Sequence, residues 1–274
     1  MVRNVTKGSD MKFSMASVFG GSFAMLRKGF VPLLLVTLVV YLGPNLLVSF
    51  AMQHLLGITL GMPAAWQGQF LPVGIGVSLF LYFLMFVHAS VVTEIAVLTS
   101  SDKAVRIGEV LRHGAGNALP IFVIYLLCGL GWALGWILII FPAFIFGTAF
   151  SVVIPAYVTE KPGIFAAFTR SRQLTKGHRW GIFGMWFLIL FATYVVSGTL
   201  EAPVVWPIIQ RGMQAASNGV VAASPTFSFA ATVLLTVVGS VVWVVLLVFN
   251  AGFYAALRSD KEQFSGQRVE KVFE

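Results

Sequence analysis

The placement of charged residues constrains this chain more than any other feature. No Asp, Glu, Lys or Arg occurs between Lys28 and Glu94, and three further long runs are equally free of charge. A charged side chain at the centre of a bilayer costs about 2.5 to 3.5 kcal/mol on insertion scales, so long uncharged runs mark segments that can cross a membrane. Only 10% of the residues are charged and 58% are hydrophobic. A soluble domain carries about 25% charged residues, so this composition excludes a water-soluble globular fold.

The uncharged runs divide into segments of the length that a helix needs to cross the hydrocarbon core, about 20 residues. The first run is long enough for two helices, joined by the Gly- and Pro-containing stretch 57–69. The second run holds two helices separated at Pro142, because proline interrupts a helix and lipid offers open backbone groups no partner. The predicted membrane-spanning helices cover residues 30–56, 70–96, 118–140, 142–159, 180–200 and 227–252. We therefore predict an all-α fold, a polytopic membrane bundle of about six transmembrane helices.

The basic residues predict the orientation of this bundle. All 18 Lys and Arg residues except Arg211 fall in the N-terminal segment, the second loop, the fourth loop or the C-terminal tail. An even number of spans puts these segments on one side, and Lys and Arg in short loops stay cytoplasmic. We predict a cytoplasmic N-terminal segment with an amphipathic helix (1–29), a transmembrane domain (30–257) and a cytoplasmic tail (258–274). The net charge of +8 is thus a sign of topology, and no nucleic-acid partner is expected.

Three cytoplasmic segments share one design, with apolar residues at helical spacing followed by basic residues and glycine. They contain Phe19, Phe23 and Leu26; Ile107 and Leu111; and Ile164, Phe165 and Phe168. Such spacing puts the apolar side chains on one stripe, as in a helix that lies in the membrane surface. We predict three units, each a short in-plane helix followed by a transmembrane hairpin. The alternative is that these segments are ordinary loops whose basic residues set the orientation.

The stretch 141–179 carries a recognisable series of residues. Pro142 is followed by a small residue, a second proline stands at Pro155, and Glu160 and Gly163 precede an Arg-Ser-x-x-Leu-Thr-x-Gly segment that ends at Gly177. This series, with 254–262, resembles the bacterial family that includes the membrane domain of glycerophosphoryl diester phosphodiesterases. The resemblance covers about residues 100–274, with Ala in place of the more usual Gly at position 143.

The resemblance implies a multi-pass protein of the bacterial inner membrane. It implies no phosphodiesterase activity, because no segment of this chain is long or polar enough to form that enzyme's soluble catalytic barrel. It carries over no catalytic residues, since stand-alone members of the family are membrane proteins of unknown function.

The cations and hydroxyls of the fourth loop form the candidate lipid-headgroup site. Its residues are Arg170, Ser171, Arg172, Thr175, Lys176 and Arg179. Guanidinium groups bind phosphate oxygens in bidentate fashion, and each juxtamembrane cation attracts anionic lipid by about 1 kcal/mol. Membrane lipids, with anionic phospholipid as the candidate, are therefore the expected partners, while protein partners are unknown. The alternative is that these residues only set the orientation and pair with Glu160 or with carboxylates of the tail.

Three ionisable residues in or beside the spans are candidate intramembrane polar groups, because such residues are functional candidates by default. They are Glu94, His88 and Glu160. Glu94 has a structural alternative, which is to snorkel or to pair with Arg106. His88 lacks the spacing of metal ligands, so polar packing is the alternative there.

No motif in the sequence predicts a catalytic residue, a metal or a cofactor. Our leading hypothesis is a non-catalytic membrane protein that acts through lipid or partner contacts at its basic cytoplasmic face. The alternative is a transporter of a small solute or lipid, in which Glu94 or Glu160 couples the movement and helices broken at Pro142 and Pro155 line the path. A membrane-embedded enzyme ranks third.

Overall fold

The computed structural model describes residues 14–55, 64–137, 140–218 and 228–270. Within these ranges the chain is helical and contains no strand, which confirms the predicted all-α fold. In chain order the helices are α1 (Met15–Lys28), α2 (Phe30–Val36), the π-helical segment η1 (Thr37–Leu42), α3 (Gly43–Leu55), α4 (Ala64–Ser100), α5 (Ile107–Ile137), α6 (Ile140–Ala149), α7 (Val153–Glu160), α8 (Ile164–Thr175), α9 (Arg179–Ser217) and α10 (Phe229–Glu270). Helices satisfy their own backbone hydrogen bonds, as apolar segments in lipid require.

Five helical segments in the described ranges are long and apolar enough to cross a membrane. They are Phe30–Met52, Pro72–Ser100, Ile107–Gly135, Arg179–Ser217 and Phe229–Glu262. Each contains or overlaps one of the predicted spans, although α9 and α10 continue well beyond the predicted ends. The chain therefore has the helices of a multi-pass membrane protein.

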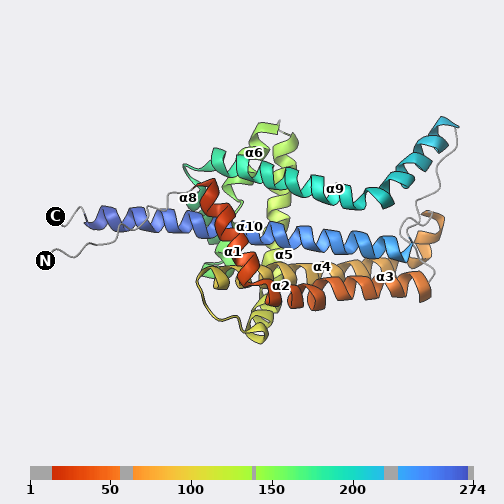
Figure 1. The fold of residues 1–274 in the computed structure, drawn as a ribbon, viewed down its shortest axis with the longest axis horizontal. Coiled ribbons are helices and arrows are strands. Elements are labelled where there is room, and N and C mark those ends of the chain that lie inside the picture. Colours follow the sequence, from red (N-terminus) through yellow and green to blue (C-terminus); the bar gives the residue numbers. More distant parts are fainter. Residues whose placement is uncertain (1–13, 56–63, 138–139, 219–227, 271–274) are drawn as a thin grey trace.

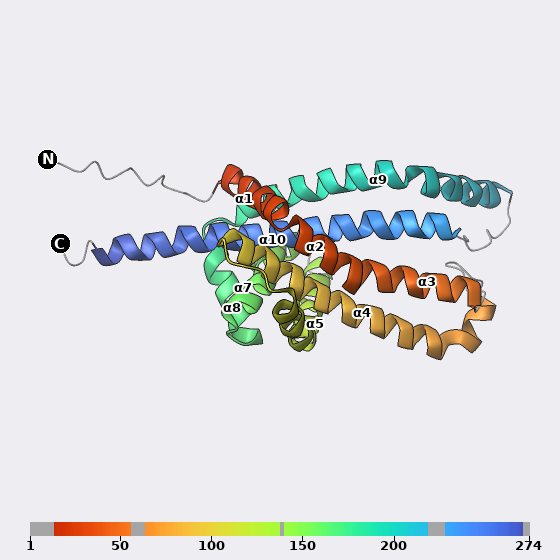
Figure 2. The same ribbon diagram turned by 60° about the horizontal axis from the view of Figure 1, so that its bottom comes forward.

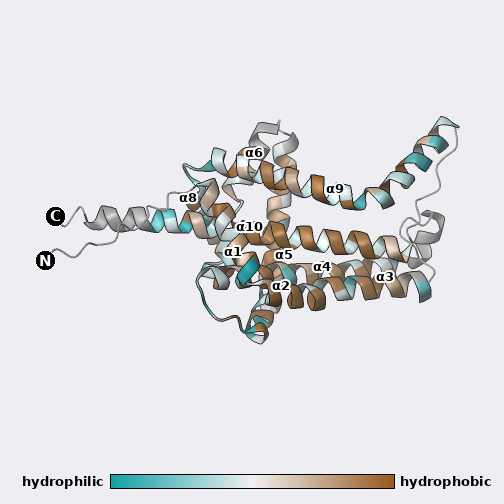
Figure 3. Ribbon diagram, in the orientation of Figure 1, coloured by the Kyte–Doolittle hydropathy of each residue, from teal (hydrophilic) through white to brown (hydrophobic). Residues whose placement is uncertain are grey.

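Four of these segments run lengthwise and define the long axis of the molecule. The continuous series α2–η1–α3 leads away from α1, α4 returns, α9 leads away again and α10 returns, as Figures 1 and 2 show. Apolar residues cover the middle of these helices, and hydrophilic residues gather toward their ends (Figure 3). The helix α1 and the C-terminal part of α10 consequently lie at the same end. We call it the basic end, because Lys28, Arg172, Lys176 and Arg258 lie there.

The helix α5 lies across the long axis instead of along it (Figures 1 and 2). It touches α4 through the Phe86 and Phe122 rings, whose centroids are 5.4 Å apart, and through Asn117, which donates to Ser90 Oγ at 3.2 Å. Ile107 and Leu111 belong to this continuous helix, so the second of the three predicted in-plane helices does not exist as a separate element. An uncharged run predicts a helix but leaves its direction open, because lipid and the interior of a bundle are equally apolar.

The fourth predicted span, residues 142–159, is wrong as a single helix. It forms the C-terminal part of α6 and most of α7, with turns at 150–152 between them. Pro155, in the first turn of α7, has no N–H to donate, so the carbonyl of Ser151 lacks the backbone donor that a continuous helix would supply. Asn250 of α10 satisfies that carbonyl instead, with an Nδ2···O distance of 2.7 Å. A neighbouring helix thus replaces the backbone donor that proline removes.

The other two segments predicted to form in-plane helices are helical, as α1 and α8, and both are short and oblique or crosswise to the long helices (Figures 1 and 2). The buried face of α1 consists of Val18, Ser22 and Met25, and it packs on α10. At Gly252 of α10 a Cβ would collide with Ser22 Oγ, so a larger residue requires the buried Ser22 side chain or α1 to shift. These contacts bring the basic residues of several segments to one end of the bundle.

Candidate functional site

The candidate lipid site lies on α8 and on the turn into α9. Two glycines with positive φ shape this segment: Gly163, at 88°, precedes α8, and Gly177, at 95°, lies between α8 and α9. Residues with a Cβ avoid that backbone region, so these positions favour glycine. The reversal at Gly177 places Arg179, the first residue of α9, next to Arg172 and Lys176, because all three line one cavity.

Two of the six predicted residues are structural. Ser171 and Thr175 are both fully buried, and their hydroxyls donate to the carbonyl of Ala149, at 3.0 and 3.2 Å. This carbonyl ends α6, where the helix no longer supplies a donor. The prediction that both hydroxyls face a lipid headgroup is therefore wrong, since they close the break between α6 and α7.

Arg170 is engaged in a polar network with other elements. Its Nε donates to both carboxylate oxygens of Glu160, at 3.0 and 2.9 Å, and Tyr254 Oη donates to the same carboxylate at 2.8 Å. The Glu262 carboxylate lies 3.7 Å from Arg170 Nη2 and accepts a hydrogen bond from Arg258 Nε. For Arg170 the structure therefore bears out the alternative, pairing with Glu160 and a tail carboxylate.

The remaining three cations, Arg172, Lys176 and Arg179, meet in one open cavity of about 510 Å³. Gly177 and Trp180 complete its lining. None of the three cations has an ion pair within the described residues, and Arg179 Nε is buried without a hydrogen-bond partner there. We call this cavity the basic pocket. It gathers three positive charges, and no carboxylate lines it among the described residues, which is the electrostatic setting for an anion.

A carboxylate of α10 lies against the same turn but pairs with another group. Asp260 is buried and pairs with His178, with 3.1 Å between Oδ2 and Nε2. Lys261 Nζ donates to the carbonyl of Lys176 at 3.1 Å, which ties α10 to the turn that precedes α9. These contacts position the turn. They leave the three positive charges of the basic pocket without a pairing carboxylate among the described residues.

Helical periodicity separates the two halves of the predicted site. Ala167, Ser171 and Leu174 recur at intervals of four and three residues and are all buried, whereas Arg172 and Lys176 are one turn apart and exposed. The same periodicity, read from the sequence of the fourth loop, places the hydroxyls of Ser171 and Thr175 on the buried face of a helix. Trp180 was predicted from the sequence as an interfacial anchor on the inner side and was not included in the headgroup site. It directly follows Arg179, and 76% of its surface is exposed.

The candidate intramembrane residue Glu94 has a partner on α5. His113 Nδ1 lies 2.8 Å from Glu94 Oε1. Arg106, its predicted partner, instead pairs with Glu109 at 3.1 Å. The pairing with Arg106 was thus wrong, although the structural interpretation of Glu94 as a paired group agrees with the contact to His113.

His88 lies fully buried between α4 and η1. Its Nε2 is 3.0 Å from Thr37 Oγ1, and its ring stacks on Tyr41 with centroids 5.2 Å apart. Its Nδ1 has no partner in the described part of the chain. Both contacts belong to the π-helical turns, so His88 packs against the irregular segment of the first lengthwise helix. In those same ranges no three His, Cys, Asp or Glu side chains gather to hold a metal.

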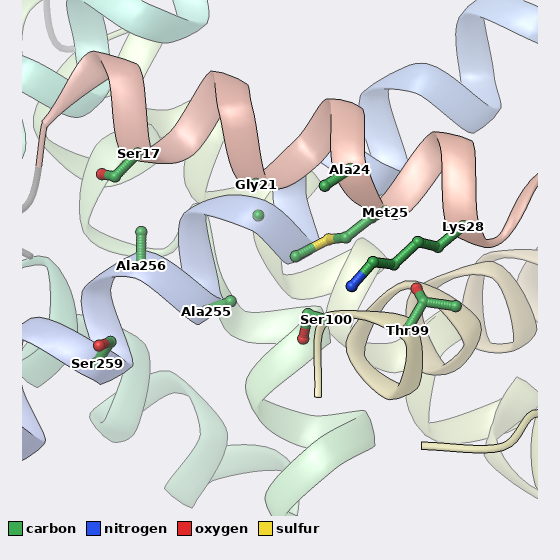
Figure 4. Close-up of a pocket in the computed structure, with 11 residues that line it drawn as sticks. Ser17, Gly21, Ala24, Met25, Lys28, Thr99, Ser100, Ala255, Ala256 and Ser259 are labelled. Atoms are coloured by element: carbon green, nitrogen blue, oxygen red, sulfur yellow. The ribbon is translucent and has the colours of Figure 1, made fainter. Parts of the chain in front are cut away.

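A second cavity lies between α1, α4 and α10, with a volume of about 240 Å³. Figure 4 shows the Lys28 and Met25 side chains extending from α1 into this space, opposite Thr99 and Ser100. Lys28 Nζ is paired with Asp102 at 2.6 Å, and the hydroxyls of Thr99 and Ser100 donate to carbonyls of their own helix. Its polar groups are largely satisfied, so this cavity is a weaker ligand site than the basic pocket.

Comparison of the chain with protein-family models, with curated proteins and with solved structures finds no match. The resemblance to the family of the phosphodiesterase membrane domain therefore stays a prediction.

Proposed function

We propose that this chain is a non-catalytic, multi-pass protein of the bacterial inner membrane that binds the headgroup of an anionic phospholipid in the basic pocket. The observation that carries the proposal is the convergence of Arg172, Lys176 and Arg179 on one cavity, without an ion pair in the described residues. Uncompensated cations at one end of an apolar bundle match the chemistry of a phosphate at a membrane surface.

The residue types suit a phosphodiester better than an isolated inorganic ion. A guanidinium group presents two parallel N–H donors to two phosphate oxygens, and the lysine amine adds a point charge. Each cation contributes about 1 kcal/mol near an anionic surface, which corresponds to about a fivefold change in affinity. Trp180 supports the assignment, because tryptophan favours the headgroup level of a bilayer.

The distribution of basic residues supports the proposed orientation. The lengthwise helices bring α1 and the end of α10 to the basic end, while Arg211, near the end of α9, lies at the opposite end (Figure 1). Positive residues of short loops are retained in the cytoplasm. In the proposed orientation the basic end and both termini are therefore cytoplasmic, and the pocket faces the inner leaflet.

Charge reversal tests the headgroup site. We expect Arg172→Glu and Lys176→Glu each to reduce the anionic phospholipid that copurifies with the protein by more than about fivefold, because a reversal removes one positive charge and adds a negative one. Lys103→Glu is the matched control, because Lys103 is exposed and lies in another loop of the basic end. Lipid extracted from purified, correctly inserted protein would be quantified by mass spectrometry. Equal anionic-lipid content in the pocket variants and in the control would overturn the proposal.

Transport of a small solute or lipid stays the alternative prediction. Its two candidate coupling groups, Glu94 and Glu160, are held by His113 and by Arg170 with Tyr254, respectively. A carboxylate that couples transport must change partners during the cycle. The headgroup site requires no such exchange and is the function that the geometry supports best.

A further inference from the structure

An apolar groove joins the basic pocket along the side of α9. It is lined by Phe144, Ile145 and Thr148 of α6 and by Arg179, Trp180 and Phe183 of α9. Its volume of about 440 Å³ lies within the range of cavities that hold small ligands, about 300 to 1,000 Å³. Arg179 and Trp180 line both cavities, so the groove and the pocket meet at these two residues.

The groove is apolar along its length and cationic at one end. The Phe144 and Phe183 rings meet edge to face with centroids 4.6 Å apart, and the Trp180 and Phe183 rings do so at 6.3 Å. Among the described residues of the lining, Thr148 alone carries a hydroxyl, and it donates to the carbonyls of Phe144 and Ile145 within its own helix. The polar groups that these described residues leave for a ligand are the Arg179 guanidinium and the Trp180 indole N–H, and both residues also line the basic pocket.

We infer that this groove holds an acyl chain of the same anionic phospholipid whose phosphate binds in the basic pocket. The inference rests on the proposed headgroup site and specifies its ligand, because an amphiphile with a negative head and an apolar tail matches both cavities at once. Charge complementarity selects this occupant over an apolar peptide segment. A free phosphate or a soluble headgroup fills the pocket and leaves the aromatic groove empty.

Burial of the chain explains how the site selects a lipid. Compared with a headgroup free in water, the acyl chain adds apolar burial, and within the bilayer it adds close packing against the groove, while the cations hold the head at the mouth of the groove. An exposed Trp180 between the two cavities covers the junction of head and chain. We therefore expect a diacyl lipid to bind more tightly than the corresponding water-soluble headgroup.

Photolabelling of the wild-type chain tests this inference directly. The full chain is reconstituted in nanodiscs that contain phosphatidylglycerol with a diazirine on one acyl chain, then irradiated and mapped by peptide mass spectrometry. We expect labels on 144–148 and 180–183, and weaker labelling there by the phosphatidylcholine analogue. Label confined to the exposed apolar surface of α9 around Leu190 and Val196, or equal labelling of the groove by both lipids, would overturn the inference.

A groove-filling substitution provides the second readout. Ile145→Trp is expected to lower the groove label about tenfold, because the indole occupies the space of several methylenes. Val196→Trp is the matched control, since Val196 is exposed on α9 outside both cavities and its substitution leaves the groove open. An undiminished groove label in correctly inserted Ile145→Trp protein would also contradict the inference.

The two proposals fail in different ways. If charge reversal at Arg172 lowers lipid retention while the groove stays unlabelled, the headgroup site stands and the chain site is wrong. If retention does not depend on charge, the headgroup site fails, and labelling of the groove then reports an apolar surface without selection for an anionic head. If Ile145→Trp changed the oligomeric state of the protein, the groove would instead be a contact surface for a second copy of the chain, and the acyl-chain site would be wrong.

Discussion

Between α6 and α7, where the backbone hydrogen bonds of the helix are interrupted, single side chains donate to the carbonyls that lack a backbone N–H partner. Ser171 and Thr175 serve the carbonyl of Ala149, and Asn250 serves the carbonyl of Ser151. A buried carbonyl that loses its partner costs about 1 to 3 kcal/mol, so these three side chains carry a share of the stability that is out of proportion to their size. The same three contacts join α6 to α8 and α10.

Removal of the Asn250 amide tests this interpretation. We expect Asn250→Leu to lower the free energy of unfolding by about 1 to 3 kcal/mol, because the Ser151 carbonyl is left without a donor. Thermal unfolding in detergent would measure the change, and copurified anionic lipid should stay constant because Asn250 does not line the basic pocket. An unchanged unfolding temperature would show that another group satisfies this carbonyl.

At the scale of elements, α1 is attached to α10 by close packing. Phe19 and Phe23 meet the Phe249 ring edge to face, with centroids 5.3 and 5.7 Å apart, and Ser22 packs against Gly252. A helix that rested on the membrane surface alone would need no such complementarity. The predicted apolar stripe of α1 thus contains residues that contact α10. The most deeply buried residues of α1, however, are Val18, Ser22 and Met25.

Enlargement of Gly252 should separate these two helices. We expect Gly252→Val to displace α1 and to destabilise the protein by about 1 to 3 kcal/mol, as overpacking does. Gly239→Val in the same helix is the control, because a Cβ at Gly239 meets no atom within 4 Å. Protease sensitivity of the connection between α1 and the rest of the bundle, with thermal stability, would report the change. Equal behaviour of the two variants would contradict the close packing.

The sequence predicts the helices better than their arrangement. In lipid, an uncharged run such as 180–200 is stable only as a helix, because a helix satisfies its own backbone hydrogen bonds. The sequence therefore predicts each of the long apolar helices. The crosswise direction of α5 and the break before Pro155 depend on contacts with α4 and α10, and the Asn250 partner of Ser151 is 99 residues away. In the candidate site, residue type and closeness in sequence grouped four cations with two hydroxyls, whereas burial on one face of α8 separates the two hydroxyls.

For the whole molecule, the lengthwise helices determine which segments share a side of the membrane. In a background with Cys128→Ser, we expect Ser14→Cys and Ser217→Cys to react from opposite sides with a membrane-impermeant maleimide. Ser14 begins the capping box of α1 at the basic end, and Ser217 ends α9 at the far end. Labelling of intact cells and of inverted vesicles separates the two. Reaction of both positions from the same side would contradict the arrangement.

The central claim is that the three cations of the basic pocket hold a lipid phosphate. A crystal structure of the full chain, grown in a lipidic mesophase that contains phosphatidylglycerol, tests it most directly. We expect phosphate density in contact with Arg172, Lys176 and Arg179, continuous with density for an acyl chain beside Phe144 and Phe183. An unoccupied pocket whose cations are neutralised by carboxylates of the protein, with lipid ordered only on other surfaces, would contradict it.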